Sequence, residues 1–145
     1  MHYDLQRFID AQQRNYATAL AEVQRGQKRE HWMWYIFPQI KGLGFSQTSV
    51  YYAIQSPDEA YEYLKNTYLH DNLVNICNAL LALSTDDPVS IFGHTDAQKL
   101  RSSMTLFDAV SVRYQLNEGI FKQVIDKFFH GQADAVTVRI LNSMQ

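Results

Sequence analysis

Strand signals are scarce in this chain, and that scarcity restricts the possible folds more than any other feature. Only His31–Phe37 (HWMWYIF) has the aromatic and β-branched content of a strand, and a run this short does not distinguish strand from helix by periodicity. Pro38 ends it in either case. A lone strand has no partner to pair with. We therefore predict an all-α fold with an irregular loop around residues 36–45.

Helical spacing of apolar residues, with start and stop signals, covers most of the remaining chain. The caps and prolines at Ser56-Pro57 and Asp87-Pro88 begin two of these segments, and Gly26 and Gly131 end two others. A compact bundle of about six to eight helices follows. We expect helices over about 4–24, 56–66, 69–84, 95–110, 120–130 and from 134 onward, with a short turn over 88–93 and a short helix after Ser46.

Size and composition place these helices in a single globular domain over residues 1–145, because 145 residues suit one core. Hydrophobic residues make up 46% and charged residues 19%, which excludes disorder, and no apolar run approaches the roughly 18 residues of a membrane span. A net charge of -2 disfavours nucleic acid as a partner. The single Cys77 and a polar start without a signal-peptide core predict a cytoplasmic location.

The aromatic stretch adjoins a basic part of the chain. Residues 24–50 carry Arg25, Lys28, Arg29 and Lys41 against Glu30, a balance of +3. Cations that bind phosphate beside Trp34 or Trp32, which would stack on a ring, are typical of a site for a nucleotide-like ligand. The alternative is a core of aromatic residues covered by the solvated stems of basic side chains.

His31 is the titratable residue best suited to proton transfer near neutral pH. On a helix it shares a face with Trp34 and Tyr35, which makes it the candidate general acid or base. A hydrogen-bonded structural histidine is the alternative. The other four histidines are scattered and form no metal-ligand pattern with one cysteine, so we predict neither metal nor cofactor.

Two cations and three hydroxyls lie within the seven residues Lys99–Thr105 (KLRSSMT). Helical spacing places Lys99, Ser102 and Ser103 on one face, where an ammonium and two hydroxyls suit a phosphate or carboxylate. Arg101 lies on the other face and is a second candidate for charge, with a scaffold role as its alternative. Against a site, mid-helix hydroxyls often bond their own backbone.

The loop Lys41–Ser46 (KGLGFS) contains two glycines that permit close approach of the backbone to a ligand. It lacks the further glycine and the lysine-serine pair of a phosphate-binding loop. A turn that joins two helices is therefore the preferred interpretation.

Long motifs spread over nearly the whole chain resemble those of an uncharacterised bacterial family, domain of unknown function 1810, whose members sometimes carry a mistaken calpastatin label. These motifs are DLQRF with AQ (4–8, 11–12), RG (25–26), HWMWYIFPQ (31–39), GLG (42–44), YAI (52–54), IFG (91–93) and KLRSSMTLF (99–107). The resemblance implies a compact, mainly helical single domain, and it supplies no catalytic residues. A chain that is 46% hydrophobic is unlike the disordered inhibitor which the calpastatin label denotes. Tyr35 stands where similar sequences often have phenylalanine, so its hydroxyl, if buried, needs a polar neighbour.

Taken together, these patterns predict a domain that binds a small anionic ligand, nucleotide-like or phosphorylated, between residues 31–44 and 99–105. The predicted ligand-binding residues are Trp34, Lys99, Arg101, Ser102 and Ser103, with His31 as the catalytic residue if proton transfer occurs. No reaction type and no oligomeric state follow from the sequence. The alternative is a non-enzymatic protein-interaction module in which the same motifs are structural.

Overall fold

The structure is a computed structural model that describes residues 3–144. This part of the chain contains eight helices and no strand, in agreement with the predicted all-α fold. None of these helices has the length and apolar character that crossing a membrane requires. The helices are α1 (Gln6–Gln24), α2 (Met33–Ile36), α3 (Gln47–Tyr52), α4 (Pro57–Lys65), α5 (Thr67–Ala82), α6 (Pro88–Arg113), α7 (Ile120–Phe129) and α8 (Ala135–Ser143).

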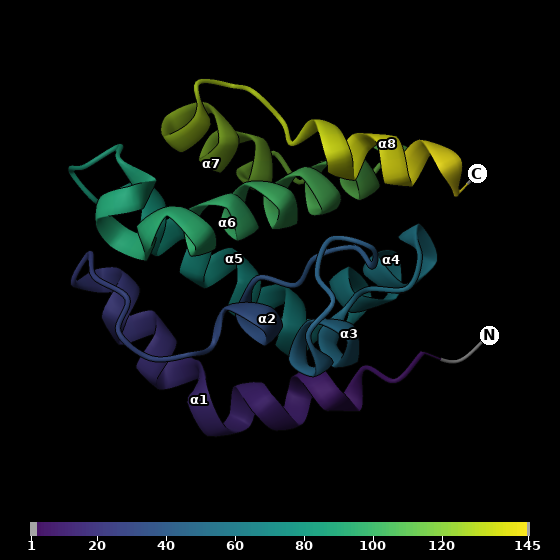
Figure 1. Cartoon of the computed structure of the whole chain (residues 1–145), viewed down its shortest axis with the longest axis horizontal. Helices are drawn as coiled ribbons and strands as arrows, with labels where there is room; N and C mark the ends of the chain where they lie inside the picture. Colours follow the sequence, from purple (N-terminus) through teal and green to yellow (C-terminus); the bar gives the residue numbers. More distant parts are fainter. Residues whose placement is uncertain (1–2, 145) are drawn as a thin grey trace.

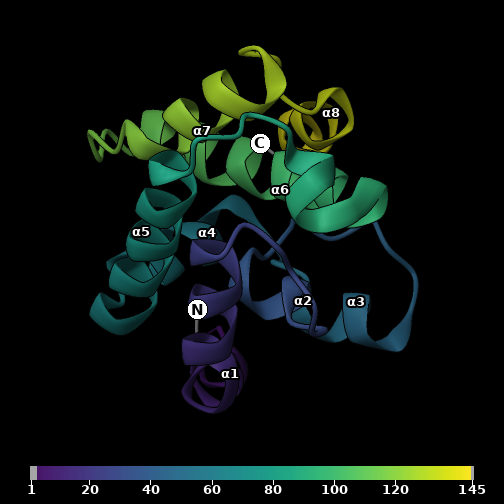
Figure 2. The same cartoon turned by 90° about the vertical axis from the view of Figure 1, so that its left-hand side faces the viewer.

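The long helix α6 organises the bundle. It packs against α4, α7 and α8, while α5 contacts both α1 and α7 and so joins the two ends of the fold. Figure 1 shows α1 along one edge and α7 and α8 along the opposite edge. Seen from the side in Figure 2, α2 and α3 lie across the molecule from α5.

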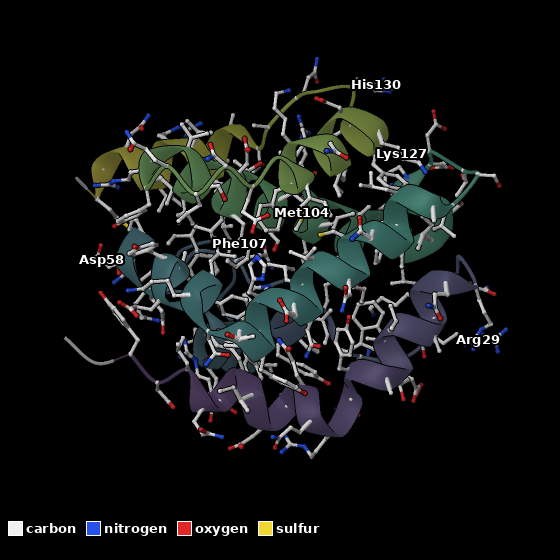
Figure 3. The ribbon with its side chains drawn as sticks, turned by 180° about the vertical axis from the view of Figure 1, so that it is seen from behind. Arg29, Asp58, Met104, Phe107, Lys127 and His130 are labelled. Atoms are coloured by element: carbon white, nitrogen blue, oxygen red, sulfur yellow. The ribbon has the colours of Figure 1, made fainter. Side chains whose placement is uncertain are left out.

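Apolar side chains of α6 occupy the centre of the core. Phe107 is fully buried, with its ring centroid 5.2 Å from that of Tyr63 in α4 and 5.7 Å from that of Phe121 in α7. The Met104 sulfur lies 3.7 Å from the Cys77 sulfur in α5. Figure 3 shows Met104 and Phe107 in the interior, behind α5. Burial of each side chain contributes about 2 kcal/mol, so α6 is fixed firmly against its neighbours.

Four helices begin at the starts predicted from the sequence, each with a side-chain cap. Side chains of Ser46, Ser56, Asp87 and Asp134 each accept a backbone N–H from the first turn of α3, α4, α6 and α8, respectively. The predicted break between a turn over 88–93 and a following helix is a kink inside α6, where Gly93 has φ 78° and ψ 169°. The expected turn over 88–93 and the expected helix over 95–110 therefore form the two parts of α6, which meet at this kink.

The ambiguous aromatic stretch forms the single helical turn α2 and then the irregular segment 37–46. Trp32, Ile36 and Phe37 are buried, and the Gln12 side chain in α1 donates to the Tyr35 carbonyl at 2.8 Å. An isolated parallel bridge joins Ile40 to Ile54. These contacts fix the loop next to α3 without a regular strand.

Candidate ligand-binding site

A cavity of about 550 Å³ lies between the 34–53 segment and the helices α6 and α8. One wall consists of Trp34 of α2, residues 39–44, and Ser49, Tyr52 and Ala53 at α3. The facing wall consists of Thr95, Gln98, Lys99 and Ser102 of α6 together with Asp134 and Val136 at the start of α8. The cavity thus lies between the two segments that sequence analysis singled out.

The loop wall depends on its glycines. Gly42 has φ +102°, a conformation that other residues rarely adopt. A Cβ on Gly44 would lie 2.7 Å from the Ser49 hydroxyl and 2.8 Å from its Cβ. At Gly44 the loop therefore packs on α3 through its backbone, without a side chain. Main-chain groups of Gly42 and Gly44 line the cavity.

Lys99 and Trp34 form a cation–aromatic pair in the lining of the cavity. The Lys99 Nζ lies 4.9 Å from the centroid of the half-buried Trp34 ring and 3.5 Å from the Asp96 Oδ1. The Lys99 side chain is 23% exposed. An ammonium over an indole face, open to a cavity, provides both a positive charge and an aromatic surface to a ligand.

The carboxylate of Asp134, at the start of α8, also lines the cavity. Its Oδ2 accepts the backbone N–H of Thr137 at 3.0 Å and the Thr137 hydroxyl at 2.6 Å, and its Oδ1 accepts the Gln98 amide at 3.0 Å. Asp134 is 7% exposed, and no Lys, Arg or His forms an ion pair with it in residues 3–144. The N-terminus of α8 and these hydrogen bonds hold the buried charge.

The predicted hydroxyls and Arg101 have different positions. Ser102 lines the cavity, and its Oγ lies 3.1 Å from the Gln98 carbonyl and 3.3 Å from Asp134 Oδ2. Ser103 is fully buried outside the cavity lining, and its Oγ has no partner among the described residues. Arg101 donates to the carbonyls of Gln132 and Ala133 at 2.8 and 3.2 Å, so its guanidinium anchors the connection to α8.

His31 is exposed and lies outside the residues that line the cavity. The adjacent Trp32 is buried, and its indole N–H donates to the Glu22 Oε1 at 2.9 Å. Burial opposes ionisation of Glu22, but hydrogen bonds from the backbone of residues 29 and 30 and from Trp32 outweigh it and lower its pKa. Trp32 therefore belongs to the core, whereas Trp34 borders the cavity. Tyr35 has the polar neighbour that burial requires, because Asn15 donates to its hydroxyl at 2.8 Å.

Several lining residues were not foreseen from the sequence. Gln39, Gln98, Tyr52 and Asp134 reach the cavity through contacts between segments far apart in the chain. The sequence offered one signal among these residues: a helix is predicted to begin at Asp134, and an aspartate at a helix start often caps it. Within residues 3–144, no three His, Cys, Asp or Glu side chains gather closely enough to hold a metal ion.

The fold and the cavity define a small helical domain with a mixed-polarity pocket between a glycine-containing loop and two helices. The chain belongs to the family described as "Protein of unknown function (DUF1810)", which matches residues 2–141. It is similar to the crystal structure of the conserved hypothetical protein Rv1873 from Mycobacterium tuberculosis, with 37% sequence identity and a TM-score of 0.90. That match covers 97% of each chain. No curated protein matches the sequence.

Proposed function

We propose that this domain binds a small ligand that carries an anionic group and a planar ring, such as a nucleotide or another phosphorylated metabolite. The Lys99–Trp34 pair at a cavity of about 550 Å³ is the observation that carries the proposal. Ligand cavities of roughly 300–1,000 Å³ hold molecules of this size.

Each wall has a separate role in this proposal. The Lys99 ammonium attracts the anionic group as a point charge, and Trp34 provides a surface on which the ring stacks. The bare backbone at Gly42 and Gly44 lets the ligand approach the loop closely. Asp134 repels a second anion, so the anionic end of the ligand lies toward Lys99 and hydrogen-bond donors of the ligand lie toward Asp134.

Ligand-induced stabilisation of the purified protein tests the proposal. The probes are AMP, ribose 5-phosphate and adenosine, which separate the contributions of phosphate and ring. A probe at a hundred times its Kd stabilises the folded state by about 2.7 kcal/mol, which raises the melting temperature by several degrees. We expect the shift to be largest for AMP and to be lost in Lys99→Gln and in Trp34→Leu.

Lys65→Gln is a matched control, because Lys65 also forms an ion pair with the residue three positions earlier and lies over an aromatic ring. Its Nζ is 3.1 Å from Glu62 and 4.5 Å from the Tyr61 ring centroid, and it does not line the cavity. This variant should respond to AMP like the unchanged protein. Equal responses of Lys99→Gln and Lys65→Gln would contradict the proposed site.

A second candidate function is a non-enzymatic protein-interaction module. Exposed apolar side chains beside the cavity favour it: Phe45 is 87%, Val50 58% and Tyr51 57% exposed. In that case no probe stabilises the protein, and Lys99→Gln and Trp34→Leu lower its melting temperature because their contacts serve only the fold. Replacement of Phe45 by serine then leaves the melting temperature unchanged, because the Phe45 side chain is 87% exposed.

A further inference from the structure

Two lysines share the Asp96 carboxylate next to a residue of the cavity lining. Asp96 Oδ2 lies 2.8 Å from the Lys28 Nζ, whereas its Oδ1 lies 3.5 Å from the Lys99 Nζ. Of these three residues only Lys99 lines the cavity. The closer contact belongs to the lysine that does not face the ligand site.

Lys28 is fixed in this position from several directions. Its side chain is 7% exposed, and its Nζ lies 5.1 Å from the centroid of the buried Trp32 ring. Its backbone N–H donates to the Ile91 carbonyl at 2.8 Å, which ties the 25–32 connection to α6. The long Lys28 side chain is therefore ordered, and Asp96 is its partner among the described acidic residues.

We propose that Lys28 is a positioning residue that cancels the charge of Asp96 and thereby keeps the Lys99 ammonium available to an anion in the cavity. The ligand part of this inference rests on the proposed function. One carboxylate balances one of the two ammonium groups, so one positive charge remains. The shorter Lys28–Asp96 contact and the ring beneath Lys99 place that remaining charge at the cavity.

Removal of Lys28 changes which ammonium group pairs with Asp96. In Lys28→Met, Asp96 has Lys99 as its remaining basic neighbour, so the Lys99 ammonium moves onto the carboxylate and away from the cavity. Removal of both charges in Lys28→Met/Asp96→Asn leaves Lys99 unpaired and available again. Lys28→Arg retains the cation and should behave like the unchanged protein.

The first measurement is AMP affinity by isothermal titration calorimetry, with adenosine as the uncharged probe. We expect Lys28→Met to weaken AMP binding about fivefold, the size of effect that a partly exposed ion pair produces, without changing adenosine binding. The double variant should recover the original AMP affinity. A loss that the double variant does not recover would show that Lys28 acts only through the fold and would overturn the inference.

The second measurement needs no ligand and therefore separates this inference from the proposed function. Limited acetylation of lysines, read by mass spectrometry, reports how available the Lys99 amine is relative to the exposed Lys122. We expect Lys99 in Lys28→Met to react about fivefold more slowly and the double variant to regain the original rate. Unchanged Lys99 reactivity in Lys28→Met overturns the inference. Failure of AMP to bind the unchanged protein, with the acetylation pattern as expected, contradicts the proposed function alone.

Discussion

The guanidinium of Arg7 connects three parts of the fold. Its Nη atoms bond the Glu59 carboxylate in α4 at 2.9 and 3.3 Å, its Nε donates to the Tyr51 carbonyl at 2.9 Å, and Nη2 also donates to Ala53 at 2.9 Å. The two charged side chains are only 6% and 1% exposed. Because α3 ends at these carbonyls, Arg7 also fixes the wall of the cavity.

Replacement of Arg7 by alanine should destabilise the protein severely. It leaves the buried Glu59 carboxylate without its cation, which typically costs about 3–5 kcal/mol. Urea unfolding followed by circular dichroism measures this change. As a comparison, Lys122→Ala removes an ion pair with Asp126 whose side chains are 61% and 52% exposed, and it should leave the midpoint nearly unchanged. Similar midpoints for the two variants would contradict a structural role for the Arg7–Glu59 pair.

His70 joins α5 to the connection between α6 and α7. Burial alone would lower its pKa, but hydrogen bonds to the carboxylates of Glu118 and Asp71 outweigh burial and raise the pKa above its usual value. A raised pKa in the folded state means that folding favours the protonated imidazole. The stabilisation is therefore complete below the unfolded-state pKa of about 6.5 and is lost as the pH rises through the higher folded-state value.

We expect the stability difference between the unchanged protein and His70→Gln to shrink as the pH rises from 5.5 to 9. Paired urea titrations at several pH values measure this difference. The variant should be the less stable protein at pH 5.5 and should approach the unchanged protein at pH 9. A difference that grows with pH would mean that the neutral imidazole is the favoured form.

At the scale of elements, the kink in α6 requires a glycine. Gly93 combines φ 78° with ψ 169°, a backbone region that is nearly restricted to glycine. A Cβ at this position would meet no atom within 4 Å. Any loss of stability on replacing Gly93 by alanine therefore comes from backbone strain and not from a steric clash. The kink redirects the chain just before the turn of α6 that carries Thr95, Gln98 and Lys99.

Gly93→Ala should therefore lower the free energy of unfolding by about 1–3 kcal/mol. Gly119→Ala is the matched control, because Gly119 is also exposed but has φ −80°, which alanine adopts readily. Its effect should stay within about 0.5 kcal/mol. Thermal unfolding of both variants measures the two changes. A similar loss of stability in both would show that the loss of a glycine, and not the backbone conformation at Gly93, is the cause.

Helices with local signals and the irregular loop around residues 36–45 were predictable from the sequence, whereas the conformation of residues 31–37 was not. The caps predicted at Ser56 and Asp87 are confirmed by the structure, and Asp134 caps the helix that was predicted to begin there. The turn α2 is held by contacts from α1, such as the Gln12 bond to the Tyr35 carbonyl, and local spacing does not reveal such partners. The α5 helix begins after a cap at Asn66, which the pattern placed at the end of the preceding helix.

The candidate site was predictable only in part, for the same reason. Lys99 and Ser102 share a helix face, and the structure places both at the cavity with Trp34. Ser103 points into the core instead, because a face estimated from spacing alone does not show where burial begins. The position of Asp134 depends on how α8 returns to α6, which is a long-range feature.

On the scale of the whole molecule, buried residues form a continuous core that extends from Phe8 in α1 to Leu141 in α8. Such continuity couples the 31–46 segment to the long helices. We therefore propose that residues 1–145 unfold as one cooperative unit, as small single domains usually do.

Urea unfolding tests this proposal with two signals. Far-ultraviolet circular dichroism reports the helices, and near-ultraviolet circular dichroism reports the packing of the aromatic side chains. We expect the two curves to coincide. An aromatic signal that disappears at lower urea concentration would reveal separate unfolding of the aromatic segment.

The different surroundings of the two tryptophans make intrinsic fluorescence a reporter of ligand binding. Trp32 lies in the core with its N–H bonded to a carboxylate, whereas Trp34 lies beneath an ammonium at the cavity. In Trp32→Phe, all indole emission comes from Trp34. Ligand binding in the cavity then changes the emission wavelength and intensity of Trp34 fluorescence, so ligands can be screened without a dye or a label.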